Sequence, residues 1–265
     1  MLAPDQDVLR ARRHKTTRSI IALVLREMST TYGRSLVGYA WAILEPVAAI
    51  ALLSVAFQFA FRSPALGSNF PFYFATGFLP FAMTVELASK IGSSLRFSKA
   101  LLAYPAVRFI DAIIARTLLC VLTNLMIMAI VLTGIHVIFD INSIIDPSSI
   151  MLSIGMAVAV GLGVGCLNCF LFSEFPAWER VWQVITRPLV LVSGVIFFYD
   201  TMPAMLQSVM WYNPLTHVVG AMRRGFFATY DATHVTPAYV MSVAMITGGF
   251  GLLLLYRHHK ELMDK

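Results

Sequence analysis

The sequence predicts an all-α polytopic membrane protein, because six long apolar stretches fill most of the chain and charged residues are scarce. Of the 265 residues, 58% are hydrophobic and only 13% are charged. A hydrocarbon core of ~30 Å needs ~20 mostly apolar helical residues, and each stretch reaches or nearly reaches that length. We therefore expect six transmembrane helices, at residues 36–61, 70–89, 112–139, 150–172, 181–199 and 237–256.

The orientation of these helices is predicted by the distribution of Lys and Arg. Of the 20 cations, fifteen fall in the two terminal segments and in the connections after the second and fourth stretches, and Arg187 lies in the part of the fifth stretch next to the latter connection, which makes sixteen on one side. Three fall in the alternate connections, and Arg116 lies inside the third stretch. The positive-inside rule then places both termini in the cytoplasm, in agreement with an even number of spans.

The chain divides into a cytoplasmic segment, residues 1–35, and a six-span transmembrane domain, residues 36–265. Within the first segment, a short apolar run at 19–25 follows several cations and ends at Arg26 and Glu27. No small-residue cleavage site follows it, so it does not have the pattern of a signal peptide. We expect it to form an amphipathic helix that lies on the cytoplasmic face of the membrane.

The fourth stretch contains Gly161, Gly163 and Gly165, a spacing that superficially matches a nucleotide-binding fingerprint. No strand precedes these glycines and the stretch is uncharged, so we interpret the GxxxG pair of Gly161 and Gly165 as a site of close helix packing. The three cysteines also lie within apolar stretches and are expected to be small packing residues.

The connection between the fifth and sixth stretches, residues 200–236, is long and partly apolar. Apolar residues recur there at helical spacing, but Pro214 removes a backbone donor and breaks any single helix. Each half is too short to span a bilayer. We expect a re-entrant pair of short helices at 204–227 that dips into the outer leaflet and returns, with its backbone groups buried in protein.

The sequence lacks the common motifs of an enzyme. It contains no phosphate-binding GxxxxGK[ST], no HExxH and no GxSxG, and its six histidines are dispersed. The formal net charge of +6 follows from the one-sided distribution of cations, with no sign of a nucleic-acid groove. We therefore expect a non-enzymatic chain with no metal, cofactor or nucleic acid of its own, driven by an energy source elsewhere.

Two features inside the apolar stretches are candidates for function. Glu45 lies about two turns into the first stretch, directly before Pro46, where it either binds backbone groups disturbed by the proline or faces a pathway. Aromatic residues crowd the first two stretches and the connection between them. They form either an interfacial belt or, at deeper positions such as Phe57 and Phe78, planes on which sugar rings stack.

Three motifs resemble a known family. Residues 26–46, REMSTTYGRSLVGYAWAILEP, resemble the opening of ABC-transporter permeases that export capsular polysaccharide. Residues 101–105, LLAYP, and 213–217, NPLTH, followed by Arg223, are similar to motifs shared with O-antigen, teichoic-acid and some drug exporters. The connection after the fourth stretch reads SEFP at 173–176, where the family usually has an Arg-Asp pair.

The resemblance implies a half-transporter of the bacterial inner membrane. Two copies would pair around a pathway, and each would bind a cytoplasmic ATPase subunit that carries ATP and Mg, giving a 2:2 complex that passes polymer to periplasmic and outer-membrane partners. The expected contacts with the ATPase are Arg26, Glu27, Arg34, Arg96, Lys99, Leu101 and Tyr104. The expected substrate pathway comprises Arg34, Trp41, Glu45, Phe57, Tyr73, Phe78, Lys90 and Arg187.

Two alternatives remain open from the sequence. One is a permease for O-antigen, teichoic acid or another glycan or lipid, which shares the later motifs. The other is a membrane-embedded glycosyl- or phosphotransferase. Such an enzyme would need a cluster of Asp residues at a membrane boundary to hold a metal, and the acidic residues here are scattered.

Overall fold

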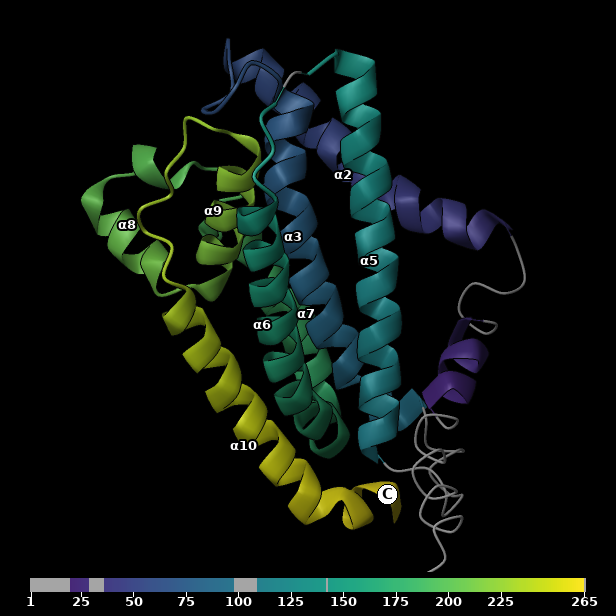
Figure 1. The fold of residues 1–265 in the computed structure, drawn as a ribbon. Helices are drawn as coiled ribbons and strands as arrows, with labels where there is room; N and C mark the ends of the chain where they lie inside the picture. The colour runs from purple at the N-terminus through teal and green to yellow at the C-terminus, as the bar shows by residue number, and fades with distance from the viewer. Residues whose placement is uncertain (1–19, 29–35, 98–108, 142, 265) are drawn as a thin grey trace, which may run out of the picture.

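The computed structural model describes residues 20–28, 36–97, 109–141 and 143–264, and the regular elements in this part of the chain are all helices (Figure 1). Residues 20–28 form a short N-terminal helix. The elements that follow are α2 (Leu36–Ala60), α3 (Phe70–Gly92), α5 (Phe109–Phe139), α6 (Pro147–Glu174), α7 (Pro176–Val192), η1 (Tyr199–Thr201), α8 (Ala204–Trp211), α9 (Pro214–Phe226) and α10 (Pro237–Asp264). The fold is therefore that of an all-α membrane protein.

The helix starts follow from local sequence signals. The Asn69 side chain accepts a hydrogen bond from the Phe72 amide (3.1 Å) at the start of α3, and the Asn213 side chain accepts one from the Leu215 amide (3.0 Å) at the start of α9. Both helices have Pro in their first turn, where a missing N–H costs nothing. Pro214 thus begins α9 and ends any continuation of α8, as the sequence predicts.

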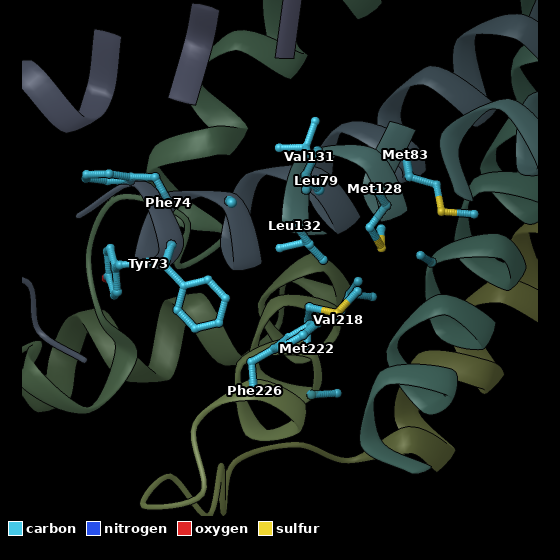
Figure 2. Packing of buried hydrophobic residues seen from close by; sticks show 14 of the residues in the cluster. Tyr73, Phe74, Leu79, Met83, Met128, Val131, Leu132, Val218, Met222 and Phe226 are labelled. Atoms are coloured by element: carbon cyan, nitrogen blue, oxygen red, sulfur yellow. The ribbon is translucent and has the colours of Figure 1, made fainter. Parts of the chain in front are cut away.

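Helix α6 is the centre of the fold and packs against α10, α3 and α9. Figure 2 shows how buried side chains from α3, α5 and α9 converge into one apolar cluster. The labelled members are Tyr73, Phe74, Leu79, Met83, Met128, Val131, Leu132, Val218, Met222 and Phe226. These side chains fix α9 against the membrane helices, even though α9 is too short to cross a bilayer itself.

Glycines allow α6 to approach two helices closely. A Cβ atom on Gly161 or Gly165 would clash with side chains of α3, which confirms the prediction of close packing at this GxxxG pair. On the other face, a Cβ on Gly163 would meet the Ala244 carbonyl of α10. A Cβ on Gly251 of α10 would likewise meet the α6 backbone. The α6–α10 contact is therefore backbone against backbone.

Helices α2 and α7 lie at the periphery. Within Ala40–Ala60 of α2, only 11% of the most apolar part is buried. Helix α7 has no buried residue. Figure 1 shows α2 inclined steeply across α3 and α5. Successive long helices run in opposite directions, so the chain passes back and forth between the two ends of the bundle (Figure 1). We name as the basic end the one with residues 20–28, the end of α3, the start of α5 and the end of α10 (Figure 1).

Four described helical segments are long and apolar enough to cross a membrane: Ala40–Ala60, Phe109–Phe139, Pro147–Glu174 and Pro237–His258. Helix α3 contains Pro80, Glu86 and Lys90, and α7 is only 17 residues long. The length and composition of the described helices thus support four spans directly. The count of six stays a prediction.

The predicted fifth span, 181–199, is wrong in its bounds. Helix α7 begins five residues earlier, at Pro176, and ends at Val192. Gly194 then turns the chain with a φ of 76°, a conformation that suits glycine. The other stretches agree with their helices to within a few residues, except that α10 runs on to Asp264.

Replacing Gly251 with Val tests the α6–α10 contact. The new side chain would meet the backbone of Cys166 and Leu167, so the two helices must separate. We expect the free energy of unfolding to fall by about 1–3 kcal/mol, the usual cost of overpacking. Thermal unfolding of the detergent-purified protein measures the effect. Gly249→Val is the matched control, because nothing lies within 4 Å of a Cβ at Gly249. Equal midpoints for the two variants would contradict the packing.

Candidate functional site

A cavity of about 480 Å³ opens between α2, α3 and α5. It forms because α2 crosses the other two helices at a steep angle instead of packing along them (Figure 1). The lining residues are Trp41, Ala42, Glu45, Pro46, Phe78, Leu79, Phe81, Ala82, Val85, Glu86, Asn124 and Ile127. Aromatic planes and a few polar groups therefore meet in one concave space, which is the usual composition of a ligand site.

Glu45 is the least satisfied polar group of the cavity. Its side chain is exposed, and no residue in the described part of the chain donates a hydrogen bond to it or forms an ion pair with it. The sequence allows a structural role beside Pro46 or a role in a pathway, and both stay predictions. A carboxylate inside a candidate span is costly unless water or another hydrogen-bond donor reaches it.

The opposite wall carries Glu86, whose two oxygens are both engaged. One forms an ion pair with Lys90, one turn further along α3, and the other accepts a hydrogen bond from the Asn124 side chain of α5 (2.9 Å). Lys90 is one of the expected pathway residues. Its ammonium group forms an ion pair with Glu86, so the positive charge of Lys90 is offset within the protein.

The structure brings together three of the expected pathway residues, Trp41, Glu45 and Phe78. Phe57 lies elsewhere, with its ring 5.2 Å from that of Phe74 between centroids. Tyr73 is buried on another face of α3. These two residues therefore do not line the cavity.

Two further expected pathway residues are Arg187 and Arg34. Arg187 is exposed on α7 and does not line the cavity. Arg34 lies outside the described residues.

Tyr73 packs against Arg223, a residue whose role the sequence did not reveal. Arg223 is 2% exposed, and its guanidinium donates to the carbonyls of Gly194 (2.7 Å) and Val195 (2.9 Å). The guanidinium carbon lies 4.1 Å from the centroid of the Tyr73 ring. Arg223 was counted as an ordinary cation of an outer connection. The sequence did contain one sign that Arg223 is buried, which is its position in a mostly apolar helical segment.

The expected ATPase contacts fall into two groups. Glu27 is buried, and its carboxylate accepts a hydrogen bond from Arg116 (2.7 Å). Arg96 forms an ion pair with Glu179 at the start of α7, which supplies a charge pair near the position where the family motif departs. Arg26 is exposed on the N-terminal helix. The other group, Arg34, Lys99, Leu101 and Tyr104, lies outside the described residues, and all the ATPase contacts stay predictions.

No cluster of His, Cys, Asp or Glu able to hold a metal occurs among the residues that the structure describes. The three cysteines are buried thiols within α5 and α6. The described site is a cavity with aromatic and acidic walls.

Comparisons with known proteins agree with this picture. The polysialic acid transport protein KpsM of Escherichia coli is 29% identical over 250 residues, which cover 92% of this chain and 95% of KpsM. The capsule polysaccharide export inner-membrane protein BexB of Haemophilus influenzae is 28% identical over 241 residues, covering 90% of this chain and 88% of BexB. CtrC of Neisseria meningitidis serogroup A, a protein of the same description, is 25% identical over 243 residues and 92% of both chains.

A model of the ABC-2 type transporter family matches residues 18–227. The match includes the N-terminal helix, the cavity between α2, α3 and α5, and the buried Arg223 on α9. Because it covers most of the 265 residues, this chain belongs to the ABC-2 type transporter family.

Proposed function

We propose that this chain is the transmembrane subunit of an ATP-binding-cassette exporter that moves a lipid-anchored capsular polysaccharide across the bacterial inner membrane. The family match and the three similar proteins, each named for the transport or export of such polymers, support the proposal. The single structural observation that carries it is the cavity between α2, α3 and α5, which combines aromatic planes with an unpaired carboxylate.

The cavity suits a sugar because its two kinds of group match the two surfaces of a pyranose ring. The C–H face of a sugar packs on aromatic planes such as Trp41 and Phe78, and its hydroxyls donate to a carboxylate such as Glu45. Trp41 is 63% exposed in the single chain, so its indole is accessible to a ligand. Several weak contacts of this kind bind a polymer without holding it in one register.

The proposed topology has six membrane helices, α2, α3, α5, α6, α7 and α10, with both termini in the cytoplasm. The basic end of the bundle then faces the cytoplasm, in line with the positive-inside rule. Residues 20–28 form the interfacial helix of the segment 1–35. Helices α8 and α9 form the re-entrant pair, and the apolar packing of α9 on α3 and α6 supports this assignment.

The proposed assembly is a homodimer with two ATPase subunits, which bind ATP and Mg. An ABC-2 type permease works with such a partner, and the sequence lacks a phosphate-binding loop of its own. The exposed apolar surface of α2 supports a second copy as one of its neighbours. Periplasmic and outer-membrane export proteins would receive the polymer on the far side.

Purified alone, the chain should show no ATP hydrolysis above background, because it has no phosphate-binding motif. Co-expression with the cognate ATPase should yield a 2:2 complex that hydrolyses ATP. Phosphate release and mass measurement of the purified complex test both statements. Robust hydrolysis by the isolated chain would overturn the half-transporter assignment.

Trp41→Ala should slow polymer export by about three- to tenfold at an unchanged level of the complex. A stacked aromatic contact is worth about 0.5–1.5 kcal/mol beyond the burial of its area. Surface polymer per assembled complex is the measurement. Phe59→Ala is the matched control, because Phe59 lies on the same helix, is 89% exposed and does not line the cavity. Equal loss in both variants would indicate a general effect of exposed aromatics instead of a substrate contact.

A further inference from the structure

Arg116, near the start of α5, joins three segments of the chain at the basic end. Its Nε donates to the Glu27 carboxylate of the N-terminal helix (2.7 Å). Its Nη1 donates to the Lys90 carbonyl (2.9 Å) and the Ser93 hydroxyl (3.0 Å) at the end of α3. The ring of Phe97 lies 4.3 Å from the guanidinium carbon. One side chain thus connects the N-terminal helix, α3 and α5.

Burial makes these contacts hard to break. The side chains of Arg116 and Glu27 are only 8% and 10% exposed. Separating the pair within the protein would leave two desolvated charges, which is strongly unfavourable. An exposed ion pair such as Arg96 with Glu179, by contrast, separates at little cost because water replaces each partner. Movement of the N-terminal helix therefore carries Arg116 and its other partners with it.

The contacts continue from Arg116 to the cavity. Lys90, whose carbonyl binds Arg116, forms an ion pair with Glu86 through its side chain. Glu86 accepts a hydrogen bond from Asn124, and both of these residues line the cavity. An unbroken series of polar contacts therefore runs from Glu27 to the cavity wall, through α3 and α5.

We propose that Arg116 is a positioning residue that transmits movement of the N-terminal helix to the wall of the polysaccharide cavity. The inference rests on the proposed function and on the ATPase contacts expected at Arg26 and Glu27 of that helix, through which motion of the ATPase subunit would reach it. The buried pair acts as a fixed joint, so a shift of the N-terminal helix displaces the end of α3 and the start of α5 together. Glu86 and Asn124 then change their positions relative to Glu45 on α2.

Arg116 could have a purely structural role, in which it and Glu27 only neutralise each other's buried charge. A double variant separates this role from the transmission of movement. Arg116→Met alone leaves the Glu27 carboxylate buried without its guanidinium partner, so the complex should be poorly assembled. Adding Glu27→Leu removes the second charge and fills similar volume, which restores assembly in comparable buried pairs. The double variant nevertheless lacks the directional bonds to Glu27, Lys90 and Ser93.

The readout is polymer exported per ATP hydrolysed, from surface polymer at a matched level of the complex and ATP turnover of the purified complex. We expect the double variant to assemble with the ATPase and to export at least about fivefold less polymer per ATP hydrolysed than the original chain, the lower range for coupled sites. Arg224→Met, an exposed arginine of α9 changed in the same way, should keep the original ratio.

If the double variant exports as much polymer per ATP as the original chain, the inference is wrong. In that case the only role of the Arg116–Glu27 pair would be to neutralise two buried charges. A strain that lacks the whole chain distinguishes this failure from that of the proposed function. If that strain keeps its surface polymer, the proposed function falls and the inference falls with it. If the strain loses its polymer while the double variant exports normally, the transmission role of Arg116 alone is wrong.

Discussion

Hydrocarbon supplies no hydrogen bonds, so each polar group that this chain carries into the membrane must find its partner within the protein. Arg116, and Arg223 through its two terminal nitrogens though not through its Nε, meet this constraint in a similar way. Each is buried, donates to backbone carbonyls at the end of another helix and lies against an aromatic ring. Arg223 thereby holds the turn after α7 on α9, and Arg116 holds the end of α3 on α5. The arrangement of the helices at both ends of the bundle depends on these two guanidinium groups.

Glu45 stands out because it does not meet the constraint within the described chain. It lies on α2, the least buried of the four segments long and apolar enough to span. A carboxylate inside an apolar segment is unfavourable unless water or another hydrogen-bond donor reaches it, and the low burial of α2 leaves the Glu45 side chain open to such a partner. The tight α6–α10 contact, by contrast, contains no room for a ligand. The cavity and the closest helix contact are therefore formed by different helices, α2, α3 and α5 for the cavity and α6 and α10 for the contact.

The sequence predicted the fold class and most helices because these depend on local signals. The apolar lengths of α5 and α6, the break before Pro214 and the close contacts of Gly161 and Gly165 can all be read from neighbouring residues. The end of α7 could not be predicted in this way. The Gly194 and Val195 carbonyls bind Arg223, which lies about thirty residues further along the chain, and hydropathy contains no information about that contact.

The candidate site was predictable only in part, for a related reason. Trp41 and Glu45 are four residues apart on one helix, so they share a face by helical spacing alone. Tyr73 and Phe78 are five residues apart, a rotation of about 140°, so only one of them can face the cavity. Which one does so depends on the packing of α3, where Arg223 occupies the side of Tyr73. Sequence alone could name the aromatic residues but could not choose between them.

Helix α3 connects these separate features. Tyr73 near its start packs on Arg223, Phe78 and Glu86 in its middle line the cavity, and Lys90 near its end binds Arg116. Most of its side chains are buried, so the helix cannot bend or slide locally without disturbing the apolar cluster around it. A displacement imposed at its basic end is therefore passed along its length, to the cavity wall first and then to the turn that Arg223 holds. The same close packing that stabilises α3 makes it suitable for carrying motion between the two ends of the bundle.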